Sequence, residues 1–172
     1  MSSDSVRAFE DVLLVAFVAG MIFTDMRWRR IPNVVTYPTM LIGLALSALE
    51  VPGDAARGVI DHLIAVVAVF AVGYPIVAGR MLKSGDVKFL MAVGALRGSS
   101  FVLYSALYGS LVGGLIALCY VAVRRLVPAG AAGRSSVAEL MKSWIPYGVA
   151  LGIGCLLTLW LELTGRVLGA TS

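Results

Sequence analysis

Long apolar runs separated by short polar loops dominate the sequence, and they restrict the folds that are open to the chain. A helix needs about 20 apolar residues to cross a bilayer, within a range of roughly 17 to 25. Five runs meet or approach this length, at Phe9–Thr24, Val34–Leu49, Val59–Ala78, Phe101–Val123 and Trp144–Leu163. Hydrophobic residues make up 59% of the chain and charged residues 14%, against about half and a quarter in soluble domains. We therefore expect an integral membrane protein of several helices.

A sixth run, Val87–Leu96, is apolar but too short to cross a bilayer alone. We expect it to form a short, tilted or partly re-entrant helix that leads through Gly98–Ser100 into the next span, because irregular backbone at membrane depth persists only where protein buries it. The stretch Pro128–Ser136, rich in Ala, Gly and Ser, is expected to be a flexible loop. The expected fold is thus all-α, a single domain over residues 1–172 with about six transmembrane helices, the fourth of them short.

The distribution of Lys and Arg predicts how these spans are oriented. Cytoplasmic loops of membrane proteins carry an excess of basic residues. If the loop at residues 25–33 is cytoplasmic, ten basic residues fall on that side, namely Arg27, Arg29, Arg30, Arg80, Lys83, Lys88, Arg124, Arg125, Arg134 and Lys142. The other four are Arg7, Arg57, Arg97 and Arg166. We therefore expect six crossings with both termini outside the cytoplasm.

Pairs of glycines four residues apart indicate close helix packing. Gly109 and Gly113 form one such pair, and Gly148 and Gly152 form another. Small residues at this spacing let helix backbones approach closely within a membrane. We expect the two segments to pack tightly against their neighbours.

The remaining reactive side chains argue against several other kinds of site. Cys119 and Cys155 fall inside apolar runs, and two isolated cysteines form neither a disulfide framework nor a zinc site. The single histidine, His62, lies beside Asp61 at the non-cytoplasmic face, where we expect a polar interfacial pair. The net charge of +4 is not gathered into a basic face, so we expect no nucleic-acid partner. We expect neither a metal ion nor a cofactor.

Two carboxylates stand at the edges of apolar runs. Asp25 closes the first run and Asp86 precedes the short one. An ionisable group in such a position is costly unless it faces water, a partner or a site. Two predicted crossings separate the two aspartates, so both are expected at the cytoplasmic face.

Carboxylates held within a few ångströms of each other cannot both ionise. The ionised group of such a pair can take a proton from water while the protonated group donates to a carbonyl oxygen. Each aspartate also has an ordinary interpretation: Asp25 can pair with Arg27 or Arg29 at the interface, and Asp86 can cap the helix that follows it.

The segment from Asp25 to Thr36, DMRWRRIPNVVT, resembles the first-aspartate segment of the type IV prepilin peptidases. In that family the aspartate is followed, after five residues, by an apolar residue, Pro, Asn or Asp, and then Thr. Ile31, Pro32 and Asn33 occupy those positions here, and Thr36 follows.

The segment Gly85–Phe89, with Gly94 after it, resembles the GxGD signature of this class of membrane aspartic proteases, including its trailing lysine at Lys88. The first glycine of the signature is replaced by Lys83, so the segment reads KSGD. Gly85 still permits unusual backbone angles or a close approach before Asp86. Together the two segments extend the resemblance over most of the chain.

The resemblance implies a membrane-embedded aspartic endopeptidase with Asp25 and Asp86 as its catalytic pair and no cofactor or metal. It implies that Gly85, Lys88, Pro32 and Asn33 support the site. The partners it implies are the lipid bilayer and a prepilin-like precursor, whose short basic leader is removed at the cytoplasmic face of the bacterial inner membrane. The chain has no CxxC motif, so it resembles the short, peptidase-only members that serve Flp or tight-adherence pili, with archaeal preflagellin peptidases as relatives and no methyltransferase activity.

Two other functions remain as alternatives to the peptidase. A small proton-coupled transporter or channel would use the two carboxylates as a relay, but such acids lie near the bilayer midplane, whereas these are expected at helix ends. A non-catalytic pilus assembly subunit is compatible with Lys83 in the signature.

Overall fold

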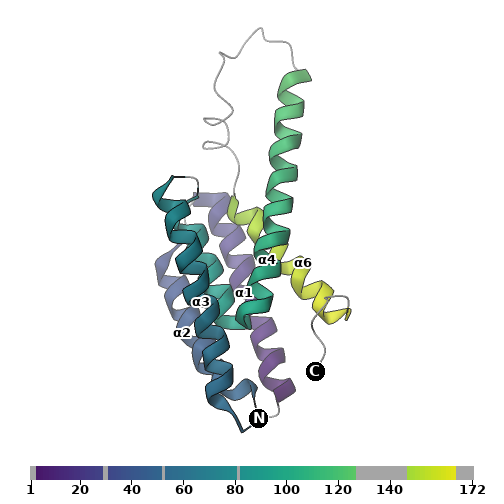
Figure 1. Ribbon diagram of the computed structural model, residues 1–172. Coiled ribbons are helices and arrows are strands. Elements are labelled where there is room, and N and C mark those ends of the chain that lie inside the picture. Colours follow the sequence, from purple (N-terminus) through teal and green to yellow (C-terminus); the bar gives the residue numbers. More distant parts are fainter. Residues whose placement is uncertain (1–2, 29–30, 52, 81, 127–146, 166–172) are drawn as a thin grey trace.

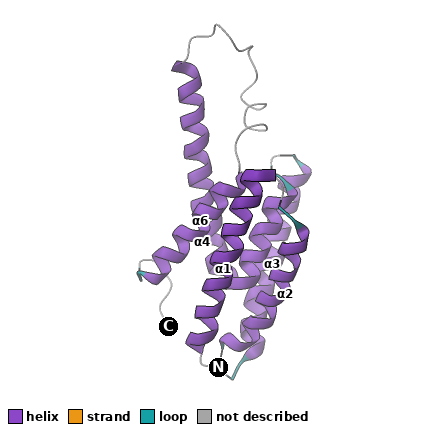
Figure 2. Ribbon diagram, turned by 180° about the vertical axis from the view of Figure 1, so that it is seen from behind, coloured by secondary structure: helices purple, strands orange, loops and turns teal. Residues whose placement is uncertain are grey.

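Helices build the part of the chain that the structure describes. The structure, a computed structural model, describes residues 3–28, 31–51, 53–80, 82–126 and 147–165. All regular elements within these ranges are α-helices (Figure 2). In chain order they are α1 (Ser3–Trp28), α2 (Asn33–Glu50), α3 (Ala55–Ala78), α4 (Ser84–Leu126) and α6 (Tyr147–Leu163) (Figure 1). The prediction of an all-α fold is confirmed for these residues.

Some sequence predictions fall outside the described residues. They are the flexible loop Pro128–Ser136, the start of the last apolar run at Trp144, and the basic residues Arg29, Arg30, Arg134, Lys142 and Arg166. Among the described residues of the last run, helix α6 covers Tyr147–Leu163 and ends where the run ends.

The chain reverses its direction inside α4, at Gly98. This residue has φ 76° and ψ −172°, a combination that essentially only glycine adopts. The first arm of α4, residues 84–97, packs along α3, and the second arm, residues 99–126, packs against α6 through Gly109 and Gly113. The Asp61 carboxylate closes the turn, because it accepts hydrogen bonds from the backbone N–H of Ser99 at 3.1 Å and from its hydroxyl at 2.5 Å. The short fourth helix expected from the sequence is the first arm of α4.

On α3, mainly small residues face the interior of the bundle, and large apolar residues face outward. The buried residues of α3 are Gly58, His62, Ala65 and Gly73, whereas its Val67, Phe70 and Val72 are more than half exposed. The second arm of α4 exposes a leucine at every fourth position, at Leu103, Leu107, Leu111 and Leu115. A helix in water buries its large apolar side chains instead. The pattern is typical of helices that pack through small residues and face lipid.

Two of the described helices are long and apolar enough to cross a membrane by length and composition. They are α3, with 24 residues, and the stretch Ser84–Cys119 of α4, which contains the reversal. At about 1.5 Å per residue α3 measures about 36 Å, which exceeds the roughly 30 Å of a bilayer core. The structure therefore does not show all six spans expected from the sequence. Helices α1 and α2 are not among those long and apolar enough to cross a membrane, and α6 is a shorter apolar helix.

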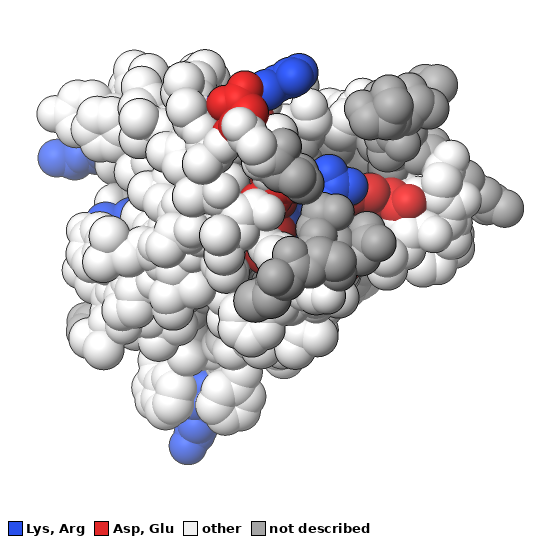
Figure 3. Space-filling view, turned by 90° about the horizontal axis from the view of Figure 1, so that it is seen from below, with Lys and Arg blue, Asp and Glu red and all other residues white. Residues whose placement is uncertain are grey.

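Ion pairs tie the helices together at the end of the bundle where Gly98 lies, which we call the Gly98 end. Arg97 in α4 pairs with Asp11 of α1 at 2.9 Å and with Glu162 of α6 at 2.6 Å. His62 is buried, and it pairs with Glu50 at 3.0 Å rather than forming the expected interfacial pair with its neighbour in sequence. Figure 3 views this end, where charged groups lie partly recessed in a mainly uncharged surface.

Candidate active site

A pocket of about 330 Å³ lies at the opposite end of the bundle, which we call the pocket end. It lies where α1 ends and where α2 and α4 begin. Its lining residues are Asp25, Ile31, Asn33, Lys83, Ser84, Gly85, Asp86 and Lys88. The pocket therefore brings together the two sequence segments that each contain one of the edge aspartates.

Both aspartates are almost fully buried although they line the pocket. Asp25, in the last turn of α1, is 5% exposed, and Asp86, in the first turn of α4, is 3% exposed. Within the described part of the chain, neither Oδ2 atom has a hydrogen-bond partner. The two carboxyl groups are close enough to interact electrostatically. Buried carboxylate oxygens normally have a hydrogen-bond partner, so these two groups are unusual and mark the pocket as a candidate site.

The loop between α1 and α2 brings Asn33 and Ile31 to the pocket. Pro32 precedes α2 in an extended conformation, with φ −74° and ψ 126°. Its carbonyl oxygen accepts hydrogen bonds from the backbone N–H of Thr36 at 3.3 Å and from the Thr36 hydroxyl at 3.0 Å. Pro32 thus defines where the helix begins, but it does not line the pocket.

Gly85 lets the second aspartate segment approach the first. A Cβ atom on Gly85 would lie 3.3 Å from the Cβ of Ile31, which is tighter than ordinary packing between carbon atoms. The same helical turn lies even closer to α3, because a Cβ on Gly73 would lie 2.7 Å from Val87 Cγ1. Glycines at these two positions allow the start of α4 to lie against both the α1–α2 loop and α3.

Lys88 connects the two segments directly. Its ammonium group donates a hydrogen bond to Asn33 Oδ1 at 3.0 Å and lies over the Tyr37 ring, 5.5 Å from the ring centroid. Lys83, which replaces a glycine of the signature, also lines the pocket and interacts electrostatically with Asp86. Two lysines therefore line the same pocket as the two acids.

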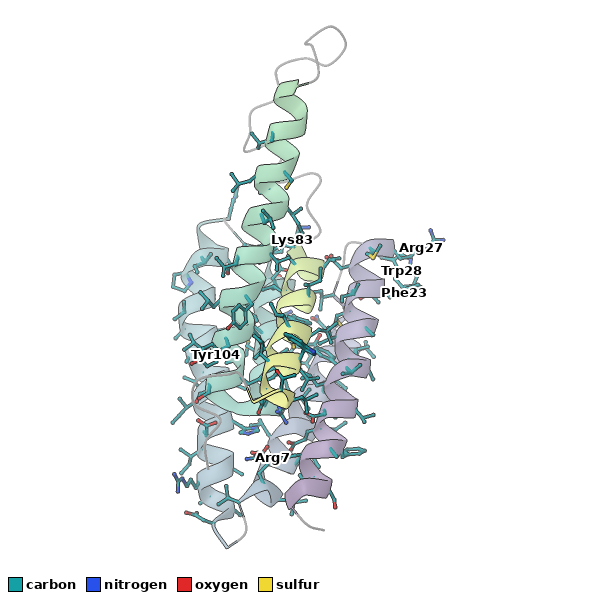
Figure 4. All side chains as sticks on the ribbon, turned by 90° about the vertical axis from the view of Figure 1, so that its right-hand side faces the viewer. Arg7, Phe23, Arg27, Trp28, Lys83 and Tyr104 are labelled. Atoms are coloured by element: carbon teal, nitrogen blue, oxygen red, sulfur yellow. The ribbon has the colours of Figure 1, made fainter. Side chains whose placement is uncertain are left out.

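The aromatic side chains near the end of α1 point away from the pocket. Figure 4 shows Phe23, Arg27 and Trp28 directed outward from the upper part of α1, with Arg7 near its other end. The Phe23 and Trp28 rings meet edge to face, with centroids 5.9 Å apart. Exposed aromatic and basic residues at this level are typical of a membrane–water interface.

The structure brings together five of the six residues predicted for the site. Asp25, Asp86, Gly85, Lys88 and Asn33 all line the pocket, and Pro32 holds the adjoining helix start. The sequence interpretation did not assign four further neighbours to the site. These are Ile31, Lys83, Ser84 and, against Asp25, Gly148 of α6.

The carboxyl groups of Asp25 and Asp86 can perform acid–base chemistry. Of two adjacent carboxyl groups one ionises and the other keeps its proton, and such a pair can both accept a proton from water and donate one to a carbonyl oxygen. Within the described residues no three or more His, Cys, Asp or Glu side chains are arranged to bind a metal ion. The chemistry that the pocket itself offers is therefore that of Asp25 and Asp86 beside two lysines.

Comparison with known proteins supplies one match. Residues 12–118 match a sequence model of the type IV leader peptidase family. This range is more than half of the chain, and it contains both aspartates but not α6. No curated protein and no solved structure matches the chain.

Proposed function

The chain belongs to the type IV leader peptidase family, and we propose that it is an aspartic endopeptidase in which Asp25 and Asp86 activate a water molecule. Family membership makes the chain a peptidase, and its apolar helices make it an integral membrane protein. The carboxylate mechanism, the substrate and the orientation described below are our proposal.

The single observation that carries the proposal is the convergence of two buried carboxyl groups in one pocket. They come from segments far apart in the sequence, and both lie at the pocket end of the bundle. A capping or surface role would not require two side chains from segments far apart in the sequence to be buried in the lining of one pocket. Their position at helix ends also favours a peptidase over a proton relay near the bilayer midplane.

Hydrolysis by this pair needs only groups that the pocket provides. The ionised aspartate takes a proton from water while the water oxygen bonds to the scissile carbonyl carbon, and the protonated aspartate gives its proton to the carbonyl oxygen. The tetrahedral intermediate then breaks its C–N bond. Its hydroxyl proton returns to one aspartate, the other aspartate protonates the leaving nitrogen, and a carboxylic acid and an amine remain.

The alternating direction of the helical segments supports six crossings. Contacts between α3 and the first arm of α4, and between the second arm and α6, are those of antiparallel neighbours. The ion pairs of Arg97 join the start of α1 to the end of α6 at the Gly98 end. We propose that α1, α2, α3, the two arms of α4 and α6 each cross the bilayer.

The basic residues support a cytoplasmic pocket end. Arg27, Arg80, Lys83 and Lys88 all lie at or near that end, and basic residues mark the cytoplasmic side of a bacterial inner membrane. We propose that the substrate is a prepilin-like precursor of the Flp type, whose short basic leader reaches the pocket while its apolar helix stays in the bilayer.

The proposal is tested with the full chain reconstituted in liposomes together with a precursor that has a short basic leader ending in glycine. Asp25→Asn and Asp86→Asn remove the carboxylates with little change in volume. Each should lower the rate of cleavage by about 100-fold to 10,000-fold while the protein still inserts and melts like the wild type. Substantial cleavage by an Asp86→Ala variant would show that the assignment is wrong.

A further inference from the structure

The carboxyl group of Asp25 lies directly against Gly148, the second residue of α6. A Cβ atom on Gly148 would lie 2.7 Å from Asp25 Oδ2 and 3.0 Å from Asp25 Cγ. Carbon and oxygen atoms that are not bonded do not approach so closely without displacement. Helix α6 therefore covers an acid of the pocket, although the family match ends at residue 118, before α6 begins.

Helix α6 cannot retreat to make room for a side chain at this position. On its other side a Cβ on Gly154 would overlap the backbone nitrogen of Gly109, and a Cβ on Gly109 would lie 3.0 Å from the Cα of Leu151. The two backbones are thus in direct contact. Near its end α6 is also tied to Arg97 through Glu162 at 2.6 Å. Close-packed backbones transmit displacement instead of absorbing it, so a methyl group on Gly148 would move Asp25 and not the helix.

We propose that Gly148 is a positioning residue of the active site, and that its lack of a side chain is what allows the Asp25 carboxyl group to stay beside Asp86. The inference rests on the proposed function, because that function gives the pair of acids its role. It adds α6 to the machinery of a site whose other parts come from α1, α2 and α4. Gly148 does not touch the reacting atoms and acts only through Asp25.

The chain contains a matched control on the same helix. Gly152 lies one turn further along α6 and also packs against α1, where its Cβ would lie 2.7 Å from Ile22 Cγ1 and 2.8 Å from Ile22 Cδ1. Ile22 is apolar and is not part of the pocket lining, so a shift of its side chain displaces neither acid. Gly148→Ala and Gly152→Ala thus add the same methyl group to the same interface, and only the first one meets a carboxyl group.

The kinetic test compares the two variants in liposomes with the precursor described above. Gly148→Ala should lower kcat by about 100-fold, which is the loss expected when a reacting group moves by about 1 Å, and should leave KM within about threefold of the wild type. Gly152→Ala should stay close to the wild type in both constants, and the two variants should melt at similar temperatures. The inference is wrong if Gly148→Ala cleaves as fast as Gly152→Ala, or if both variants lose activity together.

A second measurement locates the side chain at position 25 without using activity. Asp25→Cys is introduced into a chain that carries Cys119→Ala and Cys155→Ala, and the reaction of the new thiol with a small methanethiosulfonate reagent is timed. Adding Gly148→Ala should speed the reaction, since the side chain is pushed from beneath α6 toward the pocket, whereas adding Gly152→Ala should not. Equal reaction rates with Gly148→Ala and with Gly152→Ala would overturn the inference about Gly148 and leave the proposed function unaffected. Cleavage by Asp25→Asn and Asp86→Asn would instead overturn the proposed function.

Discussion

At the scale of single residues, the pocket is held by short polar and steric contacts around Asp25 and Asp86. Lys88 donates to Asn33, Gly85 lies against Ile31, and Gly148 lies against Asp25. Each contact joins the neighbourhood of one aspartate to another segment of the chain, so each contributes to keeping the two acids together. Substitutions here should affect turnover more than the stability of the fold.

The bond between Lys88 and Asn33 provides a prediction at this scale. Lys88→Met and Asn33→Ala should each lower kcat/KM, because each removes the direct link between the two aspartate segments. The double variant should lose less than the product of the two single effects, with a coupling energy of about 0.5–3 kcal/mol in a double-mutant cycle. Arg27→Met, at a side chain that points away from the bundle (Figure 4), is the control and should cleave normally. Fully additive losses would mean that the bond does not support the site.

At the scale of the elements, the reversal inside α4 decides where its two arms lie. Gly98 adopts a conformation that is almost closed to other residues, and Asp61 accepts hydrogen bonds from Ser99 just beyond it. The ion pairs of Arg97 reinforce the turn from the side of α1 and α6. The Gly98 end is thus a structural anchor, and the pocket lies at the other end of the same helices.

Gly98→Ala should therefore destabilise the protein. The backbone conformation alone costs about 1–3 kcal/mol for a residue with a side chain, and the added methyl group would also meet the Asp61 carboxylate. Gly20→Ala is the control, since Gly20 lies inside α1 with no neighbouring atom within 4 Å. It should be neutral or stabilising by up to about 1 kcal/mol, in line with the helix propensity of alanine.

Unfolding of both variants in detergent micelles, followed by circular dichroism, measures the difference. A Gly98→Ala protein as stable as Gly20→Ala would show that the turn tolerates a side chain and that the reversal does not depend on glycine.

At the scale of the whole molecule, the proposed orientation places the pocket end in the cytoplasm and the Gly98 end outside it. Single cysteines in a chain with Cys119→Ala and Cys155→Ala test this with a maleimide that does not cross membranes. Arg27→Cys and Arg80→Cys should react only from the cytoplasmic side, and Arg57→Cys, at the start of α3, only from the opposite side. If Arg27→Cys and Arg80→Cys reacted from opposite sides, the two aspartate segments could not share a site, and the peptidase mechanism would be refuted.

The amino-acid sequence alone predicts the helical class, the ends of several helices and the candidate acids. Apolar runs must form helices in lipid because backbone polar groups have no other partners there. The two aspartate segments are identified by the spacing of the residues around Asp25 and Asp86. It could not reveal that Gly148 lies against Asp25, that Asp61 closes the reversal at Gly98, or that His62 is buried against Glu50. Those contacts join residues remote in the chain. The spatial neighbour of a glycine or a charged residue is defined only once the helices have packed, because all the helix surfaces together determine the packing.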